Sequence, residues 1–211
     1  MEAKHIEMRT LALSVSAVLL VELGVRMTSL ASSLSTLGLA RLIQALLIVW
    51  IAGAEGAGTA CIGLKRSGWL HALWRGLLWS AAFGAVALCA LGLLSLTGMN
   101  VLSMIRSPLP HKVDMMVLFF LVGGVVAPVT EEIFFRGLVY GFFRRWGAVV
   151  AVILSTALFA FAHPLQSLPF TQIVGGLLFA LSYEVEGNLL VPITIHVLGN
   201  LAIFALSALR I

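Results

Sequence analysis

Two adjacent carboxylates and one arginine stand inside one of the most apolar regions of the chain, in the sequence Thr-Glu-Glu-Ile-Phe-Phe-Arg-Gly at positions 130–137. The segment 117–129 before them carries no charge, and Arg136 is the only charged residue between positions 133 and 143. A charged side chain at the centre of a bilayer costs about 2.5 kcal/mol or more, so an intramembrane acid is by default a candidate functional residue. Glu131 and Glu132 are therefore the first candidates for chemistry.

Helical spacing separates the two acids and links other polar residues to them. Glu132 and Arg136 are four residues apart, which suits an ion pair along a helix, while Glu131 points about 100° away. Two later motifs use the same spacing, Phe159 with His163 and His196 with Asn200. Residues four apart on a helix share one face.

A glutamate, two histidines and an asparagine, without a suitably placed serine or cysteine, indicate attack by water. A carboxylate in a low-dielectric cavity binds a proton more readily, which suits a general base. One histidine could polarise the water, and the second histidine and the asparagine amide could donate to an oxyanion. The set predicts hydrolysis of an amide bond inside the membrane. Two structural alternatives remain: each histidine could be an interhelical hydrogen-bond partner, and the acids with Arg136 could form an ion cluster.

The composition of the chain indicates that these residues lie in a membrane protein. Of the 211 residues, 61% are hydrophobic and 10% are charged, and the mean hydropathy is +1.09. A soluble domain carries about 25% charged residues. The net charge of +4 does not indicate nucleic acid, because the basic residues are scattered between apolar segments, as beside anionic lipid. No nucleic-acid partner is expected, and the first apolar run, without a small-residue cleavage site, is expected to be a retained helix.

The apolar segments predict an all-α, polytopic transmembrane bundle of about seven spans in one domain, 1–211. The fourth is unusually long, and Pro128 predicts a break there, which would give eight spans if the segment is split or re-entrant. We expect 1–112 to supply N-terminal spans and 113–211 the catalytic core. The expected spans are 10–25, 39–54, 76–96, 115–143, 148–163, 170–183 and 189–209.

Residues at the ends of these spans and between them give further structural predictions. Glu22 and Arg26 are spaced for an ion pair, Glu55 is expected to end a helix in an interfacial loop, and 65–75 resembles an interfacial anchor with basic residues and tryptophans. Cys61 and Cys89 are expected to be buried as small hydrophobes.

Membrane depth is consistent with one common site. Lengths are measured from the turn that joins the fourth and fifth spans, at about 1.5 Å per residue. Glu131 lies about 21 Å before this turn, and His163 lies about 27 Å after it. From the turn before the last span, at the same membrane face, His196 is about 12 Å deep and Asn200 about 18 Å. The four side chains can therefore meet in a cavity in the middle or outer half of the bilayer.

Eight of the thirteen basic residues fall on the side of the N-terminus, or seven if Arg136 lies within the membrane, which favours a cytoplasmic N-terminus.

Three motifs in order resemble the CPBP family of intramembrane proteases, which includes the CAAX prenyl endopeptidases and bacterial proteins called Abi or bacteriocin-processing. The motifs are Glu131-Glu132-x-x-x-Arg136, Phe159-x-x-x-His163 and His196-x-x-x-Asn200. The flanks match as well, with Ala127-Pro128, Phe135-Arg136-Gly137 and Gly187-Asn188-Leu189. The resemblance covers about 115–206, and the first three spans carry no part of it.

The resemblance implies a protease with a mid-bilayer cavity and a role for each matched residue. Glu131 would activate water with help from His163, and His196 and Asn200 would form the oxyanion site. Glu132 and Arg136 would hold the first motif, and Phe159 would pack or line the substrate wall. The family has been described both as glutamic-type and as metalloproteases. No cofactor is the preferred expectation. Zinc held by Glu131, His163 and His196 is the alternative, although the His-Glu-x-x-His motif is absent.

The expected substrate is a membrane-embedded or membrane-anchored protein or peptide, and the prenylated substrate is not carried over. The expected location is the inner membrane of a bacterium. If the cavity opens to the outer leaflet, a cysteine placed at Gln166 should react with an impermeant thiol reagent added outside the cell. Two other classes compete: a non-catalytic binding, immunity or scaffolding protein on the same fold, and a proton-coupled transporter, which should show two repeated halves.

Overall fold

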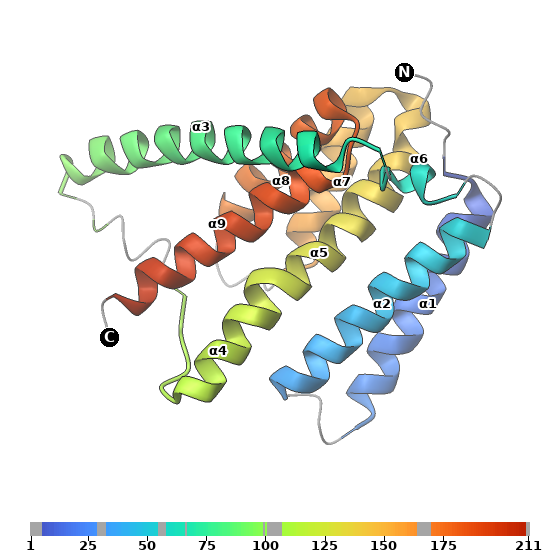
Figure 1. Cartoon of the computed structure of the whole chain (residues 1–211), viewed down its shortest axis with the longest axis horizontal. Helices are drawn as coiled ribbons and strands as arrows, with labels where there is room; N and C mark the ends of the chain where they lie inside the picture. The colour runs from blue at the N-terminus through green and yellow to red at the C-terminus, as the bar shows by residue number, and fades with distance from the viewer. Residues whose placement is uncertain are drawn as a thin grey trace.

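The computed structural model describes residues 6–28, 33–54, 58–65, 67–98, 100, 107–163 and 170–209, and every regular element within them is helical (Figure 1). The all-α bundle predicted from the sequence is confirmed. The helices that correspond to the seven expected spans are α1 Met8–Arg26, α2 Leu34–Ala54, α3 Trp69–Ser95, the segment Val113–Trp146, α7 Ala148–Phe161, α8 Phe170–Glu186 and α9 Leu190–Ala208. A short 3-10 helix, η1 Thr59–Ile62, precedes α3.

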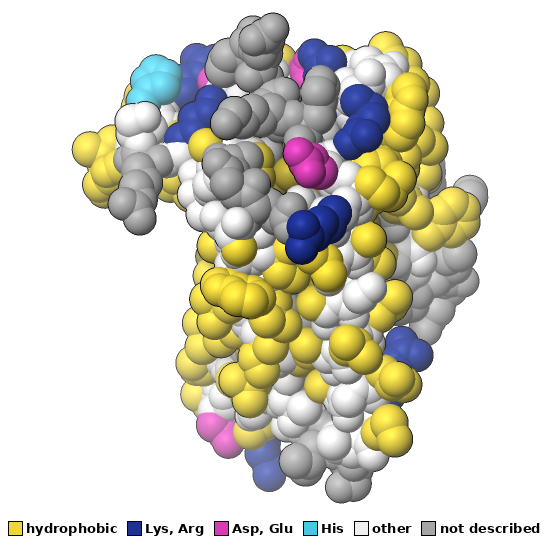
Figure 2. Space-filling view, turned by 90° about the vertical axis from the view of Figure 1, so that its right-hand side faces the viewer, with side chains coloured by type: hydrophobic (Ala, Val, Ile, Leu, Met, Phe, Trp, Pro, Cys, Tyr) yellow, Lys and Arg dark blue, Asp and Glu magenta, His cyan; other side chains and the backbone are white. Residues whose placement is uncertain are grey.

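Five of these helices are long and apolar enough to cross a bilayer: α1, α2, α3, Val113–Trp146 and α9. The chain is therefore an integral membrane protein. The helices α7 and α8 have 14 and 17 residues, or about 21 Å and 26 Å, less than the hydrocarbon thickness of about 30 Å. Figure 2 shows hydrophobic side chains over the middle of one face, with most of its charged side chains toward the upper end and fewer at the lower end.

The long fourth helix lies in the middle of the bundle and carries both glutamates (Figure 1). Its successive parts are α4 Val113–Leu121, the π-helix η3 Val122–Val126, α5 Ala127–Glu132, the π-helix η4 Ile133–Tyr140, α6 Gly141–Phe143 and the 3-10 turn η5 Arg144–Trp146. The helices α2 and α9 both contact α5. This central position allows side chains from several helices to reach the first motif.

The break predicted at Pro128 is wrong, because the helix continues from Val113 to Trp146. A proline inside an α-helix removes one hydrogen bond and collides with the carbonyl four residues earlier. Here the π turn Val122–Val126 lies directly before Ala127-Pro128. A π turn adds one residue to the helical turn and changes the hydrogen-bond register. The proline is accommodated without ending the helix, and the alternative of eight spans is not needed.

The interfacial anchor predicted over 65–75 is only partly correct, because Trp69 already begins α3. Arg75 lies in the second turn of that helix and pairs with Glu186 at the end of α8, at 2.6 Å. The indole nitrogen of Trp79 donates to the same carboxylate at 2.8 Å. Charged residues at this end of the bundle therefore join α3 to α8.

The predicted pair of Glu22 with Arg26 is also wrong, because Glu22 binds Arg41 of the neighbouring helix α2 at 3.2 Å. Arg41 also donates to Gln44 at 2.8 Å, and Gln44 is buried. The helices α1 and α2 pack side by side, so the arginine across the interface competes successfully with the one four residues away. Glu55 lies outside the described residues.

The two cysteines have different environments. Cys61 is half-buried and packs against a core cluster that contains Ile48, Ile62 and Leu138. Cys89 is exposed on α3, so the prediction that it is buried is wrong. Much of α3 presents large apolar side chains outward, which is expected of a surface that faces lipid.

The contact between α3 and α9 requires a glycine at position 76. A Cβ atom there would lie 2.6 Å from Thr194 Cβ, whereas a Cβ at Gly84, on the same helix, would meet nothing within 4 Å. We expect Gly76→Ala to lower the free energy of unfolding by about 1–3 kcal/mol, as overpacking does. Gly84→Ala should be neutral or stabilising by up to about 1 kcal/mol. Unfolding of both variants in detergent measures the difference, and equal stabilities would contradict this packing.

Candidate active site

The two adjacent glutamates occupy different environments. Glu132 is completely buried, whereas the side chain of Glu131 is 23% exposed. The hydroxyl oxygen of Thr130, directly before them, lies 3.0 Å from the backbone carbonyl oxygen of Arg41 in α2 and 2.9 Å from that of Val126 in its own helix, so its one proton is shared between these two acceptors. The first motif is thereby attached to α2, which places Glu132 inward and leaves Glu131 accessible.

Glu132 is held by two charged or polar partners. Arg136 Nη1 lies 3.1 Å from Glu132 Oε1, and His196 Nδ1 lies 2.7 Å from the same oxygen. The predicted pair of Glu132 with Arg136 is present, and both side chains have an exposed fraction of 0%. A buried carboxylate needs such partners because desolvation costs several kcal/mol. Glu132 therefore fixes the imidazole of His196 while Arg136 balances its charge.

Helix α8 supplies further contacts to the guanidinium of Arg136. Its Nη2 donates to the carbonyl of Gly176 at 3.0 Å, and its Cζ lies 4.6 Å from the ring centre of Phe159 and 5.1 Å from that of Phe179. A Cβ at Gly176 would lie 2.9 Å from Thr156 Cγ2. The absence of a side chain at position 176 thus lets α8 approach α7 closely enough for its backbone to bind the guanidinium.

Glu131 faces two histidines from two other helices. Its Oε2 lies 3.9 Å from Nε2 of His163, which lies two residues after α7, and 3.9 Å from Nε2 of His196 in α9. These distances exceed a hydrogen bond, and a water molecule can bridge polar groups at such a separation. The structure therefore brings together Glu131, His163 and His196, as the sequence predicted.

The outer ring nitrogens of both histidines point toward Glu131 because the inner ones are occupied. His163 Nδ1 lies 2.8 Å from the carbonyl oxygen of Phe159, which can only accept a hydrogen bond. The Nδ1 atom of His196 faces the carboxylate of Glu132. In the neutral form of each ring, Nδ1 carries the proton and Nε2 presents a lone pair. His196 can then donate from Nε2 only after it binds a second proton.

Aromatic rings hold the two imidazoles in place. Phe179 stacks on His196 with ring centres 4.5 Å apart and an angle of 20°. Phe159 contacts both histidines, at 4.7 Å from His163 and 5.8 Å from His196. Phe159 is therefore a packing residue in this structure.

The formal charges at the site do not balance when both histidines are neutral. Two ionised glutamates and Arg136 give −1 − 1 + 1 = −1. One further proton, on Glu131 or on either histidine, would make the cluster neutral.

Asn200 lies one helical turn beyond His196 on α9, and its side chain is engaged elsewhere. Its Nδ2 donates to the carbonyl oxygen of Gly123 at 3.0 Å. Of the residues predicted for the site, Glu131, Glu132, Arg136, Phe159, His163 and His196 form one contiguous cluster. Asn200 is connected to it through α9.

Two residues of the site were not predicted from the sequence: Gly176 and Phe179. Both lie on α8, in a stretch rich in small and apolar residues that carries no charged or motif residue near them. Their partners, Arg136 and His196, are on other helices. No spacing within α8 could indicate these contacts.

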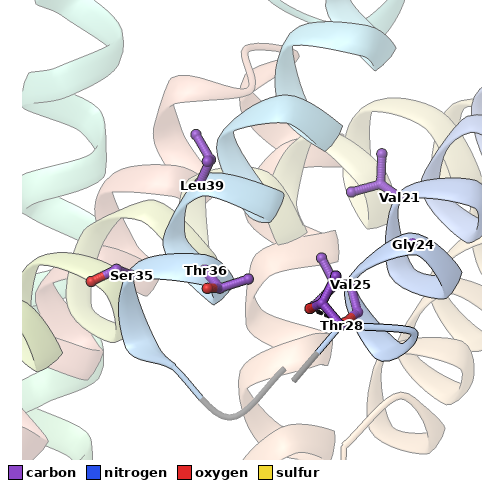
Figure 3. Close-up of a pocket in the computed structure, with 7 residues that line it drawn as sticks. All are labelled: Val21, Gly24, Val25, Thr28, Ser35, Thr36 and Leu39. Atoms are coloured by element: carbon purple, nitrogen blue, oxygen red, sulfur yellow. Dashed lines mark hydrogen bonds between the residues drawn. The ribbon is translucent and has the colours of Figure 1, made fainter. Parts of the chain in front are cut away.

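A pocket of about 460 Å³ lies elsewhere, between the end of α1 and the start of α2 (Figure 3). None of the predicted site residues lines it. Its lining residues are Val21, Gly24, Val25, Thr28, Ser35, Thr36 and Leu39.

Comparison with known protein families agrees with the motifs. Residues 113–202 match the family model described as Type II CAAX prenyl endopeptidase Rce1-like. The family resemblance indicated by the three motifs is confirmed for this segment, and the match supports an enzyme of the protease kind. No curated protein and no solved structure matches the chain.

Proposed function

We propose that this protein is an intramembrane endopeptidase that uses water activated by Glu131. One observation carries the proposal: the free carboxylate oxygen of Glu131 faces the Nε2 atoms of two histidines, each at 3.9 Å. The three residues come from three parts of a membrane protein whose segment 113–202 matches a CAAX protease family. A carboxylate and an imidazole acceptor on one water suit proton abstraction.

The reaction divides the residues into distinct tasks. Glu131, assisted by His163, takes a proton from the water as its oxygen attacks the carbonyl carbon of the scissile bond. His196, in its protonated form, and the second N–H of the Asn200 amide stabilise the oxyanion. The C–N bond then breaks, and the proton held by Glu131 passes to the leaving amine. Glu132 and Arg136 keep His196 in position throughout.

A zinc ion is the alternative activator, and the donor types fit it. Glu131 Oε2 with the Nε2 atoms of His163 and His196 would hold the ion, and the Nδ1 bonds of both histidines are those that metal-ligating histidines make. Bound zinc would supply a Lewis acid and a more acidic water. Ligand atoms around tetrahedral zinc are about 3.3 Å apart, so the present 3.9 Å separations would have to contract. The metal-independent reaction therefore remains the preferred proposal.

The proposed substrate is a membrane-anchored protein or peptide cleaved near one end, with the enzyme in the inner membrane of a bacterium and its N-terminus in the cytoplasm. As the first, fifth and seventh expected spans, α1, α7 and α9 would cross the membrane in the same direction, so His163, which follows α7, would lie toward the end of the bundle where α1 and α9 end. With this orientation that end faces the outside. Gln166, at which an impermeant reagent would test the orientation, lies outside the described residues.

The proposal is tested with the full chain in lipid vesicles and quenched fluorescent peptides that carry a lipid or apolar anchor. One peptide ends in a prenylated CAAX sequence, and the others carry the same anchor without prenyl or an apolar helix. We expect cleavage that incorporates ¹⁸O from labelled water into the new carboxyl terminus and that persists after treatment with a strong chelator. Glu131→Gln is the inactive control.

Each outcome of that experiment is decisive for one part of the proposal. Activity lost with chelator and restored by zinc would replace the glutamate mechanism with the metal mechanism. Binding of an anchored peptide with identical affinity by wild type and Glu131→Gln, and hydrolysis by neither, would favour a non-catalytic binding protein.

A further inference from the structure

We propose that Pro128 is a positioning residue that orients the side chain of Asn200 through the backbone carbonyl of Gly123. The catalytic consequence rests on the proposed function, whereas the hydrogen-bond arrangement can be tested without any substrate. Pro128 is fully buried and lies three residues before Glu131, with no direct contact to the reacting groups among the hydrogen bonds described.

The first step is the change of register in η3. The N–H of Ala127 donates to the carbonyl of Val122, five residues earlier. In an α-helix the same N–H would serve Gly123, four residues earlier. The π turn therefore takes from the Gly123 carbonyl the donor that an α-helix would give it.

The second step is the proline itself. In the π register, the donor for the Gly123 carbonyl is the N–H of residue 128, and proline has none. In a membrane, a backbone carbonyl oxygen without a donor is costly. Asn200 Nδ2 donates the hydrogen bond to this carbonyl, at 3.0 Å. The π turn and Pro128 together therefore leave the Gly123 carbonyl without a backbone donor, and the asparagine amide takes that place.

Close packing brings α9 within reach of this carbonyl. A Cβ at Gly124 would lie 2.6 Å from Leu201, and one at Gly123 would lie 3.3 Å from Phe204. The two glycines therefore allow a close approach of the helices that a side chain at either position would crowd. The approach places Asn200, next to Leu201, where its amide can reach the backbone of η3.

The contact determines which way the Asn200 amide points. A carbonyl oxygen can only accept, so the NH₂ end of the amide must face Gly123. One of its two N–H groups is used there, and the second remains available as the oxyanion donor of the proposed mechanism. Without the Gly123 contact, the amide could rotate and present its oxygen to the oxyanion.

Pro128→Ala tests this arrangement because it adds the missing N–H without adding bulk. The new N–H can serve the Gly123 carbonyl and compete with Asn200. We expect kcat for an anchored peptide to fall by about 10- to 100-fold, below the loss that follows removal of an oxyanion donor, with KM unchanged. The matched control is Pro192→Ala: Pro192 is also buried, but it lies in the first turn of α9, where backbone N–H groups have no helical acceptor. That variant should retain wild-type kcat.

A double-mutant cycle separates positioning from general damage to the fold. In the Asn200→Ala background, Pro128→Ala should cause no further loss of kcat, because the group it misplaces is already gone. A loss of equal size in both backgrounds would overturn the proposal.

A second measurement needs no substrate. The chain contains three asparagines, Asn100, Asn188 and Asn200, so selective ¹⁵N labelling of their side chains gives a simple spectrum that Asn200→Ala assigns. We expect slow hydrogen exchange of one Nδ2 proton of Asn200 in wild type and in Pro192→Ala, and faster exchange in Pro128→Ala. Unchanged exchange in Pro128→Ala would overturn the proposal, whereas faster exchange with no hydrolysis by any variant would uphold it and refute the protease function alone.

Discussion

Glu131→Gln is expected to reduce the rate of peptide cleavage by about 10²- to 10⁴-fold, the usual contribution of general acid–base catalysis. Glutamine has the same shape but cannot accept the proton of the attacking water. Glu131 has a side-chain exposure of 23% and contacts the histidines only at 3.9 Å, so the fold should not depend on its charge. The measurement compares initial rates on an anchored peptide in lipid vesicles together with the unfolding midpoint of each variant.

Glu132→Gln is the matched control for this prediction, because it makes the same chemical change at the neighbouring residue. It removes the negative charge between Arg136 and His196, so it should lower stability and reduce activity indirectly. Loss of activity with full stability is expected only for Glu131→Gln. Equal cleavage by wild type and both variants would refute the protease proposal.

Arg136→Met is expected to lower the free energy of unfolding by about 3–5 kcal/mol, the loss usual when one partner of a buried ion pair is removed. It leaves the carboxylate of Glu132 buried at 0% exposure without its cation. It also leaves the carbonyl of Gly176 without its donor. Chemical unfolding in detergent micelles gives the value, and Arg136→Lys should recover part of it, because lysine keeps the charge but not the two-pronged geometry.

The control for this loss is Arg26→Met at the exposed end of α1, where we expect a change within about 0.5 kcal/mol. The double variant Arg136→Met with Glu132→Gln removes both charges, so it should be more stable than Arg136→Met alone. A double variant that is less stable by the sum of the two single losses would show that Arg136 does not stabilise the fold by balancing Glu132.

Contacts within one helix were predictable from the sequence because residues four apart on a helix lie on one face. The spacing of Glu132 and Arg136 identified the buried ion pair and separated Glu131 from it. The apolar segments predicted the helices, and three motifs predicted the family of the segment 113–202. The same local rule was wrong for Glu22, whose partner is Arg41 across a helix interface, because spacing within a helix says nothing about a competing charge on its neighbour.

Contacts between helices were decided by the tertiary structure. Helix spacing alone could not indicate that Gly176 brings a backbone carbonyl to Arg136, or that Phe179 stacks on His196. Nor could it show that Pro128 continues the helix after a π turn and leaves the Gly123 carbonyl for Asn200. The sequence by itself determined which residue types are candidates for chemistry and which of them share a helix face, since an α-helix has 3.6 residues per turn. Only the packing decided their distances and partners, because these depend on how closely helices approach where side chains are small.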